Sequence, residues 1–455
     1  MSERPQNEKT DLKRCLGLYT CTMLVVGNMI GVGIFVTPGS VAARLPSSAL
    51  IFTVWLLGAF LAICGALSYA ELGAAYPYAG GNYVFLREAY GPVWGFLYGW
   101  TAAFITQAGT VAFLALGFTK YAGFSSPALA AASATGLILL FGVLNYLGVE
   151  VGAGTLDVIT FIKILSVVLL VGAGCLFGHG DLTHLRPLLP AQSGWWIAGA
   201  LATALVPVMY TYSGWNATVY VGGEVKRPER TIPLSLLWGV VLTAGLYLGL
   251  NLLYLYALPV EGMKGVVAIA SAAAQALFGP TAARVLSAII AVSILGCINA
   301  TLLTAPRIPF AMAQDGYFFR SFGVVHKRFK TPSHAILLEM VWAILLVLWG
   351  TLDAKGFDRL LDYVTVPSLM MNTLTVSAIF VLRRTRPTMP RPYKAWGYPV
   401  LPACFTLMIA WIVVSELRQD PRGAMLGLVI VGAGIPFYWY FRQNLVRDSG
   451  FGERR

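Results

Sequence analysis

Long apolar stretches joined by short polar connections run through almost the whole chain. Twelve of them are long enough for a membrane-spanning helix, which needs about 20 predominantly apolar residues. They lie approximately at residues 18–43, 48–75, 93–121, 128–146, 151–177, 195–222, 232–258, 284–305, 334–352, 357–382, 400–417 and 423–441. The pattern therefore predicts an all-α integral membrane protein with 12 transmembrane helices. The polar joint at residues 76–92 is expected to contain a short interfacial helix.

The first and sixth apolar segments contain residues that interrupt a helix. Residues 26–39 read VGNMIGVGIFVTPG, and residues 210–220 read YTYSGWNATVY after a proline at position 207. Within lipid, a span is broken only where it is buried in protein or lines a cavity. Small residues also allow close helix packing, but two breaks five spans apart are typical of transporters built from inverted repeats.

A helix break exposes backbone groups of both polarities. The N–H end favours an anionic group, and the carbonyl end favours a cation. A zwitterion satisfies both ends, so the two breaks predict a site for a free amino acid near the middle of the membrane. Its carboxylate is expected at the N–H groups of Val32 and Gly33.

The composition agrees with a membrane protein and sets its orientation. The chain is 57% hydrophobic and 11% charged, with a net charge of +12 and a mean hydropathy of +0.72. With both termini on the cytoplasmic side, 22 of the 32 Lys and Arg fall in cytoplasmic segments and nine in outer ones, with Lys163 inside a span. This asymmetry follows the positive-inside rule. The charge therefore indicates a multi-pass protein of the cytoplasmic (inner) membrane, and no nucleic-acid partner is expected.

Lys163 lies near the middle of the fifth span, where an ionisable side chain is costly unless it is paired or hydrated. It is therefore a candidate coupling residue, or a cation that ties helices together by bonding backbone carbonyls. Asp157 is on another face of the helix and is not expected to pair with it. Three acidic residues near the cytoplasmic ends of spans are expected to be hydrated at the interface: Glu71, Glu224 and Glu339.

The residues that bind metals or carry out catalysis are sparse. Six cysteines occur singly and are expected to be small core residues rather than a disulfide or metal framework. The four histidines have no metal-ligand spacing, and no HExxH, GxSxG or P-loop motif occurs. The sequence thus predicts no enzyme activity, no catalytic residue, no metal and no cofactor.

Several motifs resemble those of the amino acid, polyamine and organocation (APC) transporter superfamily, and most closely its L-type amino acid transporter branch. The resemblance extends over about residues 12–441. The motifs that carry it are GNMIGVGIFVTPG (27–39), SYAELGAAYPYAGGNYVFLREAYGP (68–92), YTYSGWNATVYVGGEVKRPERTIPLSL (210–236), CINATLLTAPRIPFAMAQDG (297–316) and RPYKAWGYPVLP (391–402).

The resemblance implies a LeuT-type fold with helices 1 and 6 interrupted. Two inverted five-helix repeats, at residues 17–182 and 190–382, are followed by two further helices at 399–441, with cytoplasmic tails at 1–16 and 442–455. By similarity, Val32 and Gly33 bind the substrate carboxylate, and the carbonyls of Met29, Tyr210 and Ser213 bind its ammonium. The remaining site residues implied by the resemblance are Ile30, Gly31, Gly214, Trp215, Asn216, Ser293 and Cys297.

The same resemblance bears on coupling and partners. Lys163 matches a lysine that takes the place of a sodium ion, which implies sodium-independent transport. Val32 stands where relatives often carry Ser or Ala, which leaves the backbone contact intact. The outer joint at residues 120–129, KYAGFSSPAL, lacks the cysteine that animal L-type members use to bond a glycoprotein partner. We therefore expect no disulfide-linked subunit.

Neither break contains an acidic or basic residue, so the expected substrate is a neutral L-amino acid. Exchange or uniport by alternating access is the first hypothesis. A proton-coupled symporter in which Lys163 changes charge is the second, since burial disfavours a charged lysine. A membrane-embedded sensor or enzyme is a remote third.

Overall fold

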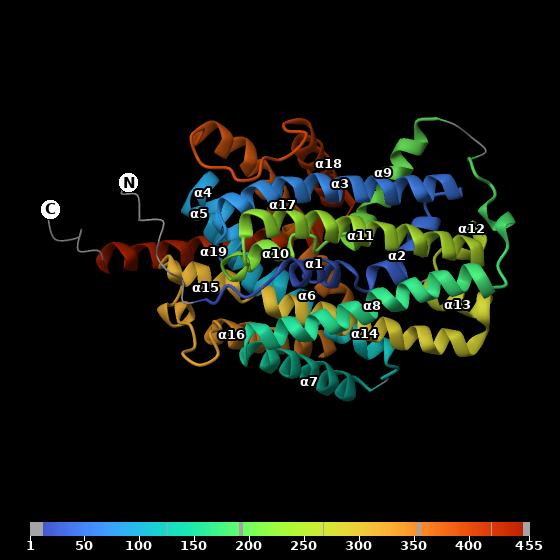
Figure 1. Ribbon diagram of the computed structural model, residues 1–455, viewed down its shortest axis with the longest axis horizontal. Coiled ribbons are helices and arrows are strands. Elements are labelled where there is room, and N and C mark those ends of the chain that lie inside the picture. The colour runs from blue at the N-terminus through green and yellow to red at the C-terminus, as the bar shows by residue number, and fades with distance from the viewer. Residues whose placement is uncertain are drawn as a thin grey trace.

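The protein is a bundle of helices in the computed structural model (Figure 1), which describes residues 12–124, 126–190, 194–266, 268–352, 356–419 and 421–448. No strand occurs among these residues; two isolated bridges pair Leu16 with Val225 and Ala79 with Val221. This all-helical architecture confirms the all-α part of the fold class expected from the apolar pattern.

The helices of the first half are α1 (Leu18–Met29), α2 (Gly33–Ala42), α3 (Ser48–Ala75), α4 (Asn82–Tyr90), α5 (Pro92–Thr101), the π-helical turn η1 (Ala102–Thr106), α6 (Gln107–Tyr121), α7 (Pro127–Tyr146), α8 (Val149–Phe177) and η2 (Leu182–Leu185). Those that follow are α9 (Trp196–Thr211), α10 (Ala217–Tyr220), η3 (Gly222–Glu224), α11 (Pro228–Ala257), α12 (Val260–Met263), α13 (Ile269–Phe278), α14 (Pro280–Thr304), α15 (Arg307–Gln314), η4 (Arg320–Gly323), α16 (Ser333–Leu352), α17 (Gly356–Thr385), α18 (Val400–Gln419) and α19 (Pro421–Asp448).

Several of these boundaries follow from local sequence. Proline occupies the first turn of α5, α7, α11 and α14, where its missing N–H costs no helical hydrogen bond. The short helix α4 lies in the joint where an interfacial helix was expected. The observed ends differ from the predicted spans by a few residues, because polar residues of the interface extend the helices beyond their apolar parts.

Seven helices are long and apolar enough to cross a membrane, or eight if the bent pair α1 and α2 is one span. Shorter apolar helices occur at Trp196–Thr211, Ile269–Phe278 and Val400–Ser415. These counts apply to the described residues, and the number of 12 spans stays a prediction.

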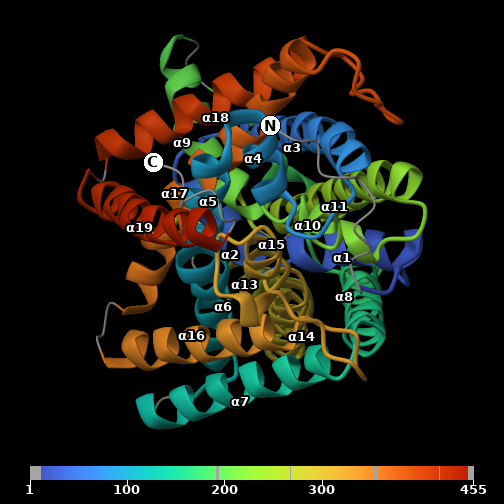
Figure 2. The same cartoon turned by 90° about the vertical axis from the view of Figure 1, so that its left-hand side faces the viewer.

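The long helices run along the longest axis of the molecule, and α3, α11 and α8 lie side by side (Figure 1). The broken first span is packed among other helices: α1 contacts α8, α11 and α14, while α2 contacts α9. Seen along that axis, α7 and α16 form one flank and α18 lies at the opposite one (Figure 2). The break between α1 and α2 is therefore enclosed by protein.

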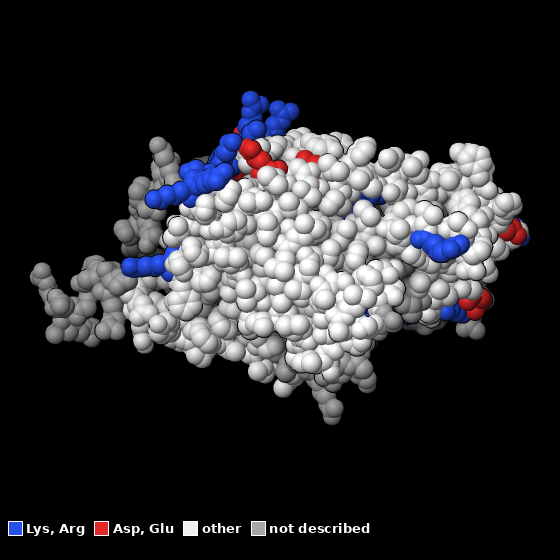
Figure 3. All heavy atoms as spheres, turned by 90° about the horizontal axis from the view of Figure 1, so that it is seen from below, with Lys and Arg blue, Asp and Glu red and all other residues white. Residues whose placement is uncertain are grey.

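The charged side chains gather at the ends of the bundle. On the face drawn in Figure 3, Lys and Arg collect toward the end that carries α4 and α15, and the middle is almost free of charge. This distribution fits a molecule whose apolar middle is covered by lipid.

The three acidic residues expected to be hydrated are instead buried, so that prediction was wrong. Glu224 is fully buried and forms two hydrogen bonds with Arg307, at 3.0 and 3.2 Å. Glu71 is bound by Arg383. Glu339 is buried, and its carboxylate has no hydrogen-bond partner among the described residues. Tertiary packing at the helix ends excludes water from positions that sequence alone places at the interface.

The cysteines follow the core prediction only in part. Cys21, Cys64 and Cys297 are buried, whereas Cys175, near the end of α8, is exposed. Apolar surroundings in sequence do not distinguish a core position from a position on the outer surface of a membrane helix.

Candidate functional site

The break in the first span leaves a carbonyl end on α1 and an N–H end on α2. Because α1 ends at Met29 and α2 begins at Gly33, residues 30–32 lie outside both helices. The last carbonyls and first N–H groups of a helix have no partner within it. In the middle of a membrane, other parts of the protein or a ligand must satisfy them.

Three side chains from two other helices donate hydrogen bonds to the carbonyl end of α1. The ammonium of Lys163, on α8, lies 2.9 Å from the Gly27 oxygen and 2.6 Å from the Ile30 oxygen. Ser293 and Cys297, one turn apart on α14, reach the same Ile30 oxygen at 2.9 and 3.3 Å. A cation at a helix C-terminus also interacts favourably with the helix dipole. The structure thus brings Lys163, Ser293 and Cys297 together at one end of the break.

These contacts are those of a cation that ties helices together through backbone carbonyls. Lys163 is only 1% exposed, and among the described residues its ammonium donates to two carbonyls and to the thiol of Cys297, at 3.7 Å. Asp157 does not pair with it, as expected; its carboxylate accepts from the Thr20 hydroxyl at 2.8 Å. Lys163, on α8, therefore holds the end of α1 in place through uncharged hydrogen-bond acceptors.

A tyrosine on α11 connects the two breaks. The hydroxyl of Tyr247, on α11, lies 2.7 Å from the Met29 oxygen and 3.1 Å from the Thr211 oxygen. Its ring packs against Trp55 and Tyr212, at centroid distances of 5.7 and 5.1 Å. The residue is fully buried. Tyr247 thus fixes the end of α1 relative to the end of α9.

The N–H end of α2 lies beside the same turn of α9. A Cβ atom at Gly33 would come within 2.8 Å of the Thr211 hydroxyl, which in turn lies 2.8 Å from the hydroxyl of Thr37. Within the described part of the chain, the N–H groups of Val32 and Gly33 make no hydrogen bond. Both residues are half-buried. Glycine at position 33 is therefore needed for the close approach of the two broken spans.

The second break lies between α9 and α10 and packs on the first. Residues 212–216 separate the two helices, and Gly214 adopts a φ of 96°, which favours glycine. A Cβ atom there would lie 3.0 Å from the backbone of Asn28, whose side-chain amide is 3.5 Å from the Gly214 oxygen. Ser213 is exposed and Tyr210 is half-buried. The two breaks therefore pack directly on one another, and Ser213 stays exposed.

Two further residues of the second break point into packed surroundings. Trp215 is buried and meets Tyr69 edge to face, at a centroid distance of 4.7 Å. The amide of Asn216 donates to the hydroxyl of Tyr220 at 3.0 Å, which lies 2.8 Å from that of Tyr98. Trp215 therefore packs against α3 and Asn216 against α10, and both side chains are buried.

Comparison with known proteins gives the family. The model of the amino acid permease family matches residues 16–434. The chain is 29% identical to the serine/threonine exchanger SteT of Bacillus subtilis, over 96% of this chain and 99% of that protein. It is 27% identical to human b(0,+)-type amino acid transporter 1, over 97% and 90%, and 28% identical to human large neutral amino acids transporter small subunit 2, over 94% and 80%.

The chain belongs to the amino acid permease family. This confirms the resemblance to the APC superfamily and to its L-type branch. The protein is accordingly a multi-pass membrane transporter and not an enzyme.

Sequence reasoning missed three polar residues of this permease that organise the breaks. Tyr247, Thr211 and Asn28 all bond backbone or side-chain atoms across the two broken spans. Their signal in the sequence is weak, because Thr and Tyr are common in membrane helices. Asn28 was inside the quoted motif, but only the fold shows that it faces Gly214.

Proposed function

We propose that this permease carries neutral L-amino acids across the cytoplasmic membrane by sodium-independent exchange. It would work by alternating access around the two breaks, in a LeuT-type arrangement of 12 spans with two inverted five-helix repeats and two further helices. The observation that carries the proposal is that the N–H end of α2, whose first N–H groups make no hydrogen bond among the described residues, packs against the second helix break.

The substrate carboxylate would bind the N–H groups of Val32 and Gly33. Both lie at the positive end of α2, where backbone N–H groups and the helix dipole favour an anion. A bound carboxylate would supply the hydrogen bonds that these groups do not make within the described residues.

The substrate ammonium would bind carbonyl oxygens of the second break. The Met29 oxygen, expected from the sequence to contribute, already accepts from the N–H of Gly31 at 2.9 Å and from Tyr247 at 2.7 Å. A carbonyl has two lone pairs. The oxygens of Tyr210 and Ser213 are therefore the better candidates, and the half-buried Tyr210 ring would cover the bound substrate.

The position of Lys163 supports the proposal of sodium independence. Its ammonium supplies a positive charge directly at the carbonyl end of α1, within 2.9 Å of two backbone oxygens. A sodium ion bound at those oxygens would meet the fixed charge of the lysine and would be repelled.

A neutral substrate is supported by the residues of the breaks. Residues 28–33 and 210–216 include no acidic or basic side chain, so a charged substrate side chain would be buried without a partner, at high cost. Relatives are named for serine and threonine exchange and for large neutral amino acids, which agrees with this choice of class and leaves the size of the side chain open.

Proton coupling is the second candidate for this permease. The observation in its favour is that Lys163 is buried against neutral partners only. Loss of its proton would remove a buried charge and loosen the carbonyl end of α1. In this mechanism the substrate would be driven by a proton gradient instead of by a second amino acid.

The orientation in the membrane, the repeat boundaries and the partners are proposed as well. Both termini would be cytoplasmic, and the division into repeats would follow residues 17–182 and 190–382, with helices 11 and 12 at 399–441. The proposed partners are the lipid bilayer and the amino acid. No disulfide-linked subunit is proposed, because residues 120–129 contain no cysteine.

A thermal-unfolding panel tests the substrate class. Purified protein is heated with each of the common amino acids in sodium-free buffer, because a ligand that binds the folded state raises its apparent stability. We expect one or more neutral L-amino acids to stabilise wild type but not Gly33→Ala, whose new Cβ collides with Thr211. Gly136→Ala, where nothing lies within 4 Å, is the control and should respond as wild type does. Stabilisation by cationic or anionic amino acids alone would contradict the proposed class.

A further inference from the structure

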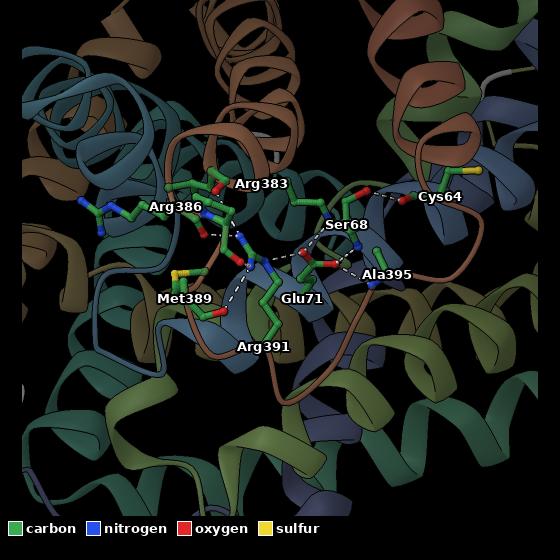
Figure 4. Close-up of polar contacts among 10 residues, drawn as sticks. Cys64, Ser68, Glu71, Arg383, Arg386, Met389, Arg391 and Ala395 are labelled. Carbon is green, nitrogen blue, oxygen red and sulfur yellow. Dashed lines mark hydrogen bonds and ion pairs between the residues drawn. The ribbon is translucent and has the colours of Figure 1, made fainter.

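The connection between α17 and α18, residues 386–399, is pinned to the end of α3 by one carboxylate. Glu71 is 2% exposed and accepts from both sides of this connection (Figure 4). Arg383 donates to its two oxygens at 2.9 and 2.5 Å, and the backbone N–H of Ala395 donates at 2.6 Å. Arg383 and Ala395, 12 residues apart in sequence, therefore meet at one side chain.

Arg391 fixes the shape of the same connection. Its guanidinium lies 3.4 Å from Glu71 and donates to the carbonyl oxygens of Leu382 and Arg386, at 3.0 and 2.8 Å. It reaches Met389 as well, at 3.1 Å. The arginine thus binds the carbonyl end of α17, which has no partners within the helix, and folds the connection back on it. The connection is held at both ends and is not a loose loop.

This anchoring leaves two cations without an acidic partner. Arg384 follows Arg383, and Lys394 precedes Ala395, so both flank residues that meet at Glu71. Both are exposed, and neither forms an ion pair with any residue that the structure describes. Arg386, by contrast, is paired with Glu88 at 2.7 Å.

A large aromatic side chain follows two residues after Lys394. Trp396 is 76% exposed, and Ala395, between it and Lys394, is buried against Glu71. The exposed apolar positions continue onto α18 at Val400, Leu407 and Trp411, on a helix that the sequence predicts to be a membrane span. Tryptophan is enriched at the level of the lipid headgroups. The connection projects from the rim of the bundle at this place (Figure 2).

We propose that Arg384, Lys394 and Trp396 form a binding site for the headgroup of an anionic phospholipid. The two cations bind the phosphate, and the indole lies along the upper part of the acyl chains, beside the exposed face of α18. Clusters of Lys and Arg next to a membrane helix attract anionic lipid. Glu71 acts as a positioning residue, because it neutralises Arg383 and leaves the neighbouring cations free.

The continuity with α18 favours a lipid over an acidic protein. A protein partner would have to cover Trp396 while lipid covers Leu407 and Trp411 on the adjoining helix. A phospholipid covers both at once, since its headgroup and chains are connected. The proposal concerns the leaflet at the basic end of the molecule and does not depend on which amino acid is transported.

Thermal unfolding of the purified full chain with added lipid tests the site. Short-chain phosphatidylglycerol should stabilise wild type, and short-chain phosphatidylcholine, inorganic phosphate and polyglutamate should not. In the double variant Arg384→Gln/Lys394→Gln, the phosphatidylglycerol concentration for half-maximal stabilisation should rise about fivefold for each charge removed. Trp396→Ala should weaken the response further.

The matched control removes two exposed cations from the same end of the molecule. Lys226→Gln/Arg230→Gln leaves the α17–α18 connection unchanged, and its response to phosphatidylglycerol should match that of wild type. An equal loss in both double variants would show general surface attraction and overturn the site. Equal stabilisation by phosphate or by polyglutamate would overturn the lipid assignment.

Discussion

At the scale of single residues, this permease stabilises its broken helices with side chains that bond backbone atoms. Lys163 and Tyr247 reach three carbonyl oxygens at the end of α1 from two different helices. A single lysine or tyrosine within an apolar segment is enough to provide these bonds. The role of Lys163 was predictable from its charge in mid-span. That of Tyr247 was not, since a tyrosine in an apolar segment is unremarkable until its neighbours are known.

Tyr247→Phe should weaken substrate binding as well as the fold. It removes the hydroxyl that lies within hydrogen-bond distance of both the Met29 and the Thr211 carbonyls, at a cost of about 1 to 2 kcal/mol in stability. We expect about a tenfold rise in the KM of transport, a loss of binding of about 1.4 kcal/mol. Tyr254→Phe on the same helix is the control, because the Tyr254 hydroxyl has no partner among the described residues. A KM that changes equally in both variants would show that the bridge has no part in the site.

At the scale of elements, the sequence predicted the breaks but not the surroundings of their ends. Glycine, proline and asparagine within apolar segments weaken helices through local chemistry, so residues 26–39 and 210–220 were recognisable. Contacts such as that of Gly214 with Asn28 depend on helices far apart in sequence. The burial of Glu71 and Glu339 was missed for the same reason, because burial is set by neighbouring helices and not by position along one span.

Lys163→Ala should impair transport more than it impairs the yield of folded protein. The variant leaves the Gly27 and Ile30 oxygens without the ammonium, although Ser293 and Cys297 still donate to Ile30. The α1 end therefore persists but is less fixed, and uptake in vesicles should fall at least tenfold. Size-exclusion profiles measure the folded fraction beside it. If the yield of folded protein and the uptake fell by the same factor, the lysine would have a purely structural role.

At the scale of the whole molecule, the Lys and Arg side chains on the face drawn in Figure 3 are concentrated toward one end of an apolar bundle. Two acid–base pairs connect separate helices there: Glu224 with Arg307, both buried, and the buried Glu71 with the half-buried Arg383. Such pairs add little stability in themselves, but removing one partner leaves a charge uncompensated. They therefore fix which helix ends meet at this side of the protein.

Glu71→Gln should lower the free energy of unfolding by about 3 kcal/mol, because Arg383 and Arg391 lose their shared carboxylate. Thermal unfolding in detergent measures the change. Glu339→Gln is the comparison: that carboxylate is buried but has no described partner, so its loss breaks no ion pair and the stability should stay within about 1 kcal/mol of wild type. The reverse order of the two effects would disprove the anchoring role of Glu71.

Countertransport in proteoliposomes tests directly whether this permease exchanges neutral amino acids without sodium or proton coupling. Vesicles are loaded with an unlabelled neutral amino acid that stabilises the protein, and uptake of the labelled form is measured with and without sodium and with and without a pH gradient. If the protein is a sodium-independent exchanger, uptake requires the internal amino acid and is unchanged by sodium or by the pH gradient. Uptake into empty vesicles that needs sodium or an inward proton gradient would contradict it.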